Sequence, residues 1–211
     1  MKMTLFNKLK KNAHRKIALL QDELVDIVYN ISDKAVFNGG TAIWRCYSGN
    51  RFSEDLDFYF RPEENFKKDF VLELNSRGLE LLKYKKTENT VFAKISNGET
   101  IVRLELAFRE KEHIVKTYEK ADGTRINVFV LSPENLLSEK MSAYNNRKLI
   151  RDIYDVYFLS SIVTDVKINA KLKEFLKKPV KPVDEKNLKT IVFSGAIPSF
   201  QQMINSLKRG V

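Results

Sequence analysis

The chain has few of the residues that form covalent crosslinks or soft metal sites. Its 211 residues include one cysteine, Cys46, and two histidines, His14 and His113. A single cysteine excludes an internal disulfide and any zinc cluster built on several cysteines. A metal ion bound by this chain must therefore be held mainly by oxygen ligands, which suit Mg²⁺.

Long apolar segments are also missing. No run approaches the roughly 20 residues needed to span a bilayer, and Lys8, Lys10 and Lys11 interrupt the N-terminal stretch before it reaches the length of a signal-peptide core. With 43% hydrophobic and 30% charged residues, the composition is typical of a soluble globular protein. We therefore expect a cytoplasmic protein without a membrane partner.

Charge of one sign is in excess. Lysine and arginine total 37 against 27 aspartates and glutamates, which gives a formal net charge of +10. Clustered basic residues gain free energy by displacing counterions from phosphates, so a nucleic-acid partner is one interpretation. A surface of solvated lysines is the other, and charge alone does not separate the two.

Hydrophobic periodicity predicts an α/β (α+β) protein, with a twisted mixed sheet flanked by helices and a helical C-terminal lobe. The catalytic lobe should cover residues 1–131, and the helical lobe, which ends in a basic tail, should cover 132–211. The expected helices are 5–31 (one helix or a pair), 41–47, 63–76, 133–146 with Ser132 as its N-cap, 148–162 and 198–209; the expected strands are 35–37, 56–60, 79–86, 90–96, 100–108, 113–118 and 125–131. We expect the lysine-rich stretch around Pro179 and Pro182 to be a connector.

The Asp-Leu-Asp step at residues 55–57 is the most informative short pattern. Residues two apart in a strand face the same side, so Asp55 and Asp57 should hold their carboxylates side by side while Leu56 enters the core. Adjacent carboxylates repel each other unless a cation lies between them. Glu105, on the polar face of an otherwise apolar strand, is the candidate third ligand or proton-accepting base.

A glycine-rich turn precedes this strand. Gly39, Gly40 and Thr41 should open a short helix whose backbone N–H groups can approach a triphosphate closely. Arg45 and Arg51 flank the turn and the carboxylates, so both are candidates to face the nucleotide. Each pattern is common on its own, but their ordered combination points to nucleotide binding.

The combined pattern resembles the DNA polymerase beta-like nucleotidyltransferase superfamily, with Gly40-Thr41 where Gly-Ser is usual. The longer match is similar to the AbiEii/AbiGii toxin family of minimal nucleotidyltransferases. It comprises Gly-Gly-Thr-Ala-Ile at 39–43, Arg45, Arg-Phe-Ser-Glu-Asp-Leu-Asp-Phe at 51–58, Ser-Pro-Glu-Asn-Leu-Leu-Ser-Glu-Lys at 132–140, and Arg147 with Arg-Asp-Ile-Tyr-Asp at 151–155. The resemblance covers about residues 30–160.

That resemblance implies roles for individual residues. Asp55 and Asp57 would bind two Mg²⁺ ions, with Glu105 as a third ligand. The nucleotide would be bound by Gly39, Gly40, Thr41, Arg45, Arg51 and Ser53, and Lys140 would contact its triphosphate and assist catalysis. For Arg147, Asp152 and Asp155, a structural and a functional role stay equally open.

The expected reaction is transfer of a nucleoside monophosphate from an NTP to an acceptor hydroxyl, in a cleft between the two lobes. By the family resemblance the acceptor would be tRNA or another RNA, the setting a toxin-antitoxin or abortive-infection system, and the protein partner a cognate antitoxin. The alternatives are a non-catalytic nucleic-acid-binding module, a kinase-like phosphotransferase, and a nucleotidyltransferase that modifies a small molecule or a protein.

Overall fold

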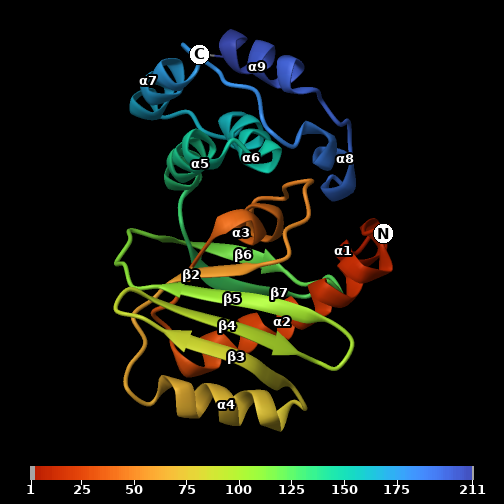
Figure 1. The fold of residues 1–211 in the computed structure, drawn as a ribbon, viewed down its shortest axis with the longest axis vertical. Coiled ribbons are helices and arrows are strands. Elements are labelled where there is room, and N and C mark those ends of the chain that lie inside the picture. The colour runs from red at the N-terminus through yellow and green to blue at the C-terminus, as the bar shows by residue number, and fades with distance from the viewer. Residues whose placement is uncertain (1–2, 211) are drawn as a thin grey trace. The chain divides into compact units, whose positions relative to one another are not determined.

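The computed structural model describes residues 3–210, which divide into two compact units. Unit 1 comprises the chain up to Ser48 together with Phe52–Leu131, and unit 2 comprises Gly49–Arg51 together with the chain from Ser132 onward. Figure 1 traces the chain through both units. None of the helices in this described part is long and apolar enough to cross a membrane.

Unit 1 is built on a seven-stranded mixed sheet with the strand order β3-β4-β5-β2-β1-β7-β6. The strands are β1 (Val36–Asn38), β2 (Leu56–Tyr59), β3 (Glu80–Lys86), β4 (Thr90–Ser96), β5 (Ile101–Ala107), β6 (Ile114–Glu119) and β7 (Arg125–Val130). The strands β3, β4 and β5 form the antiparallel meander that their turn residues predict, whereas β2 pairs with β5, and β1 with β7, in parallel.

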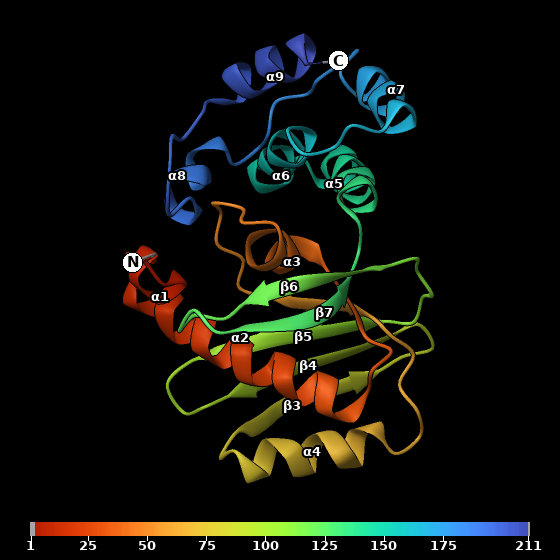
Figure 2. The ribbon, with the colours of Figure 1, turned by 180° about the vertical axis from the view of Figure 1, so that it is seen from behind.

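Alternation along the strands decides which face of the sheet is covered. In β5, Val102, Leu104 and Leu106 are buried, whereas Arg103 and Glu105 between them are exposed. The buried residues join the core beneath α2 (Asn12–Ile31) and α4 (Phe66–Ser76), and Figure 2 shows α2 lying across the strands. The opposite face of β2 and β5 is thus left to polar side chains.

Two further helices belong to unit 1. The first, α1 (Leu5–Lys8), is a single turn, and with α2 it forms the helical pair that was one of the two predicted forms of residues 5–31. The second, α3 (Gly39–Cys46), joins β1 to β2. The sequence predicted Gly39 and Gly40 as a turn before a helix starting at Thr41, but both glycines lie within the helix.

Unit 2 is helical, as predicted. Its elements are α5 (Pro133–Arg147), α6 (Ile150–Ser160), α7 (Val166–Phe175), the 3₁₀ turn η1 (Glu185–Asn187), α8 (Leu188–Ile191) and α9 (Phe200–Arg209). The Ser132 hydroxyl caps α5 by accepting from the Asn135 N–H at 3.3 Å, with Pro133 at the first helical position. The helix α7 was not predicted, although Asp165 caps it by accepting from the Ile168 N–H at 3.0 Å.

Candidate active site

The acidic residues gather on the uncovered face of β2 and β5. Parallel pairing sets Asp57 beside Glu105 in register, and Asp55 stands one residue before β2. Their apolar neighbours Leu56 and Leu104 point the other way, into the core. Asp55, Asp57 and Glu105 line a small pocket of about 60 Å³ together with Phe92 and Arg103. The structure therefore brings together the three carboxylates that the sequence singled out.

A close backbone approach links the glycine-rich turn to Asp57. Gly39 has φ +73°, and a Cβ atom placed on it would lie 2.1 Å from Oδ2 of Asp57. That distance is far below van der Waals contact, so a side chain at residue 39 and the observed Asp57 rotamer exclude each other. Gly39 is thus required both for its left-handed backbone and for the position of a carboxylate.

Thr41 and Ser53 hold the loop before β2. The Thr41 hydroxyl donates to the backbone carbonyl of Asp55 at 2.5 Å and to that of Ser53 at 3.4 Å. The Gln21 side-chain amide also donates to the Ser53 carbonyl, at 2.9 Å. The Thr41 side chain is fully buried, so it positions Asp55 from below rather than facing solvent. The Asn38 side chain makes no capping hydrogen bond at the start of α3. The groups that α3 offers to an anion are therefore its backbone N–H groups.

Arg103 forms a two-pronged ion pair with Asp55. Its Nε donates to Oδ1 and its second terminal nitrogen to Oδ2, each at 2.7 Å. Hydrogen bonding to Asp55 is the main reason that the pKa of Arg103 lies above its ordinary value. Sequence reasoning missed this residue, although Arg103 stands two positions before Glu105 and therefore shares its strand face.

Arg45, which the sequence placed near the nucleotide, instead lies inside unit 1. Its two terminal nitrogens donate to the carbonyls of Glu119 at 3.1 Å and Ala18 at 2.8 Å. The same guanidinium pairs with Asp22 at 3.1 Å, and its side chain is 0% exposed. The sequence position was misleading because the guanidinium of Arg45 turns toward α2 and not toward the carboxylate face.

Unit 2 contains its own buried cluster of charges. Arg51 donates to both carboxylate oxygens of Asp155 at 2.7 Å, and the Lys140 ammonium lies 2.8 Å from Asp155 and 3.9 Å from Asp152. Arg147 completes the cluster through two bonds to Asp152, at 2.6 and 2.7 Å. Arg51 and Lys140 were expected at the nucleotide, and the structure shows both engaged by buried carboxylates.

The pKa of Asp155 shows which effect wins in this cluster. Burial favours the neutral acid, but Arg51 and Lys140 outweigh it and hold the pKa of Asp155 below its ordinary value. A carboxyl whose pKa is lowered by folding contributes stability above its unfolded pKa, near 4, and that stability is lost as the pH falls through the folded pKa. The contribution of Asp155 to the stability of unit 2 is therefore greater at neutral pH than in acid.

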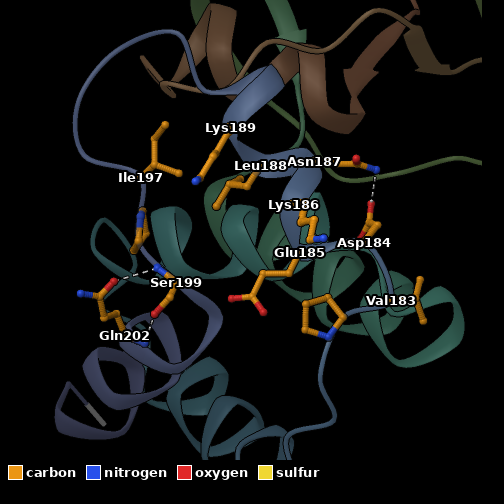
Figure 3. A pocket seen from close by; sticks show the side chains of 12 residues that line it. Val183, Asp184, Glu185, Lys186, Asn187, Leu188, Lys189, Ile197, Ser199 and Gln202 are labelled. Atoms are coloured by element: carbon orange, nitrogen blue, oxygen red, sulfur yellow. Dashed lines mark hydrogen bonds between the residues drawn. The ribbon is translucent and has the colours of Figure 1, made fainter.

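A larger pocket in unit 2 contains none of the predicted site residues. It has a volume of about 800 Å³ and is lined by residues 182–189, 197–199 and 202 (Figure 3). Beside it, the start of α9 is already satisfied: the Ser199 N–H donates to the Gln202 side chain, and the Phe200 N–H donates to Glu185, both at 2.8 Å. These N–H groups beside the pocket are therefore already bonded within the protein.

The donor chemistry of the unit 1 face fits a hard divalent cation. Within residues 3–210, no three carboxylate, imidazole or thiol side chains stand together as a finished metal cage. Asp55, Asp57 and Glu105 nevertheless supply only oxygen donors around one pocket, as Mg²⁺ prefers. Arg103 already supplies a positive charge at Asp55, which is where such an ion would be needed.

Comparison with known proteins places the chain in a family. Residues 24–210 match the model of the family described as "Nucleotidyl transferase AbiEii toxin, Type IV TA system". The chain belongs to this AbiEii family. It is thus a nucleotidyltransferase-family enzyme, and the resemblance stated from sequence is confirmed. No curated protein sequence matches the chain.

Solved structures share the fold of this AbiEii protein at low identity. JHP933 from Helicobacter pylori is 22% identical with a TM-score of 0.64, over 92% of this chain and 89% of that one. MenT4, a nucleotidyltransferase toxin from Mycobacterium tuberculosis, is 17% identical with a TM-score of 0.62, over 94% and 82%. The antibiotic-resistance factor ANT(2″)-Ia is 14% identical with a TM-score of 0.50, over 77% and 92%. These likenesses confirm the predicted nucleotidyltransferase fold.

The first prediction concerns Gly39. Gly39→Ala should lose nucleotide transfer because the new methyl group displaces the Asp57 carboxylate, whereas Gly78→Ala should keep it. Gly78 is the matched control, since it has a similar φ of +68° but nothing within 4 Å of an added Cβ. Each change should lower the free energy of unfolding by about 1 kcal/mol through backbone strain. Urea unfolding and transfer assays check both points; equal activities would mean that Asp57 tolerates the methyl group.

The second prediction concerns the buried cluster. Arg51→Met should lower the free energy of unfolding by about 3 kcal/mol at pH 7, because it removes the bidentate partner of a buried carboxylate. Part of that loss should be recovered at pH 5, because a protonated, neutral Asp155 can stay buried without its partner. Lys177→Met is the control, because its ion pair with Glu174 is exposed and should contribute under about 1 kcal/mol. A loss for Arg51→Met no greater than the control would contradict a stabilising cluster.

Proposed function

We propose that the carboxylate face of unit 1 catalyses magnesium-dependent transfer of a nucleoside monophosphate from an NTP to an acceptor hydroxyl, with release of pyrophosphate. The observation that carries the proposal is the register of Asp57 with Glu105 beside Asp55, on a strand face that the core leaves open. Membership of the AbiEii family supplies the class of reaction. A non-catalytic binding module would have no need of three carboxylates on this face.

Each residue of the carboxylate face would have a distinct role in the reaction. Asp55, Asp57 and Glu105 would hold two Mg²⁺ ions, which when bound neutralise the phosphates and align the acceptor oxygen. Glu105, the most exposed of the three, is also placed to accept the proton of the acceptor hydroxyl. The backbone N–H groups at Gly39 and Gly40, at the start of α3, would face the triphosphate.

Lys140 could bind the triphosphate only if it first left its ion pair with Asp155. As a triphosphate ligand its ammonium would have to leave Asp155, 2.8 Å away, in a site where the lysine side chain is only 10% exposed. Arg51 would face the same obstacle with two bonds to break. We therefore assign the binding of the phosphates first to unit 1. To Arg51 and Lys140 we assign a structural role: their ion pairs with Asp155 hold the segment that precedes Asp55 and the first helices of unit 2.

We further propose that the acceptor is an RNA, tRNA in the first instance, and that a cognate antitoxin restrains the enzyme. The net charge of +10 favours a polyanionic acceptor over a small antibiotic or a protein. The type IV toxin-antitoxin description of the family supports the antitoxin. Incubation with each labelled NTP, Mg²⁺ and total cellular RNA would identify the nucleotide and separate RNA from small-molecule or protein acceptors.

The third prediction tests the carboxylates. Asp55→Asn and Asp57→Asn should each lower nucleotide transfer by at least about 100-fold, because each removes a charged ligand from the reacting centre. The free energy of unfolding should change little, since relief of repulsion offsets the lost interactions. Glu54→Gln is the control, an exposed acid immediately before Asp55. Near-wild-type transfer by either aspartate variant would remove the metal-site proposal.

The fourth prediction tests RNA binding by the basic tail. Neutralising Lys173, Lys177, Lys178 and Lys181 together should flatten the salt dependence of tRNA affinity, because each lost phosphate contact removes roughly 0.7 to 0.9 logarithmic units per tenfold change in salt. A matched fourfold control replaces Lys68, Lys83, Lys85 and Lys86 in unit 1, which removes the same charge. Binding of tRNA is measured across a salt series. If the tail variant and the control run parallel to wild type, the tail does not touch RNA.

A further inference from the structure

The Arg103–Asp55 pair occupies the carboxylate that the proposed reaction needs. Both oxygens of Asp55 accept from the guanidinium at 2.7 Å, so neither points freely into the pocket that Asp57 and Glu105 also line. A divalent cation binding at Asp55 must take at least one of these oxygens. Each oxygen can accept through more than one lone pair, so the competition is electrostatic: cation and guanidinium repel each other at the same two atoms.

The pair is placed where such exchange is easy. The side chain of Arg103 is 51% exposed and that of Asp55 27% exposed, so water can replace the lost contacts on both partners. The buried pair in unit 2 is the contrast: the side chains of Arg51 and Asp155 are 5% and 2% exposed, and separating them would take the bidentate partner from a buried guanidinium. Of these two bidentate pairs, only the one at Asp55 is built to open.

A released Arg103 would remain beside the reacting centre. It stands on β5 two residues before Glu105, on the same face, and its strand is paired with β2. A guanidinium presents a planar fork of N–H donors that matches a phosphate as well as it matches a carboxylate. The same side chain can thus pass from Asp55 to a phosphate oxygen without crossing the sheet.

We propose that Arg103 is the exchangeable counter-ion of Asp55: it occupies the carboxylate in the empty enzyme and moves to the triphosphate when the metal-bound nucleotide arrives. This inference rests on the proposed function. In the empty state the guanidinium relieves repulsion among the three carboxylates and opposes binding of a metal ion alone. In the loaded state the guanidinium contacts the triphosphate and favours binding of the metal–triphosphate complex. The site therefore binds the complex in preference to the metal ion alone.

The experiment measures binding rather than turnover. Mn²⁺ alone, and Mn²⁺ complexed with inorganic triphosphate, are titrated into wild type and Arg103→Gln. The variant should bind Mn²⁺ alone about 3- to 10-fold more tightly, since its Asp55 is unoccupied, and should bind the Mn²⁺–triphosphate complex several-fold more weakly. Lys94→Gln is the matched control: Lys94 pairs in register with Arg103 on the next strand and carries the same charge. It should change both affinities less than about twofold.

A spectroscopic signal checks the movement directly. The ¹⁵N–¹H resonance of the Arg103 Nε, identified by its absence from Arg103→Gln, should shift on addition of Mg²⁺ and shift again with Mg²⁺–triphosphate. Arg103→Lys, which keeps the charge but loses the fork, should give metal affinities between those of wild type and Arg103→Gln. Thermal unfolding shows that each variant is folded.

The outcomes separate this inference from the proposed function. If Asp55→Asn and Asp57→Asn weaken Mn²⁺ binding but Arg103→Gln behaves like Lys94→Gln, the metal site stands and the exchange is overturned. The exchange is also overturned if Arg103→Gln changes both affinities in the same direction. If neither aspartate variant weakens Mn²⁺ binding, the proposed metal site itself fails. Opposite signs for the metal and its triphosphate complex, seen only at Arg103, support the exchange.

Discussion

Repulsion among carboxylates on one strand face is the constraint around which unit 1 is organised. Parallel pairing of β2 with β5 places Asp57 beside Glu105, and the two-residue period of a strand adds Asp55. In water such repulsion amounts to about 1 kcal/mol per close pair, whereas burying Leu56, Phe58 or Leu104 contributes about 1.5–3 kcal/mol each. Packing on the covered face therefore outweighs repulsion on the open face and imposes the register.

Much of the fold could be predicted because local patterns and burial agree. The alternation of apolar and polar residues predicts β5, and Ser132-Pro133 predicts the start of α5. The structure confirms both. The missed α7 shows where this agreement ends: its lysine-rich exposed face obscures the apolar positions Ile168 and Leu172. Sequence periodicity also could not reveal that β2 pairs with β5 in parallel, because pairing partners depend on long-range packing.

Some positions of the candidate site residues could be predicted and others could not, for a physical reason. The grouping of Asp55, Asp57 and Glu105 could be predicted because strand period alone fixes the side to which they point. The direction of a long side chain has no such signature, so Arg45 and Arg51 were placed by their neighbours in sequence while their guanidiniums turn to Asp22 and Asp155. The closest contact, that of Gly39 with Asp57, depends on two segments meeting and is visible only in three dimensions.

The pairs Arg51–Asp155 and Arg103–Asp55, both bidentate, show how solvent exposure divides charge between stability and function. At Asp155 burial makes separation costly, since it would take the bidentate partner from a guanidinium that water cannot reach, and the pair stays closed. At Asp55 the same geometry, with the same 2.7 Å contacts, contributes little stability because water competes for both groups. An ion pair that contributes little to folding is also one that a substrate can open. The weak Arg103–Asp55 pair is therefore suited to the nucleotide transfer proposed for this face.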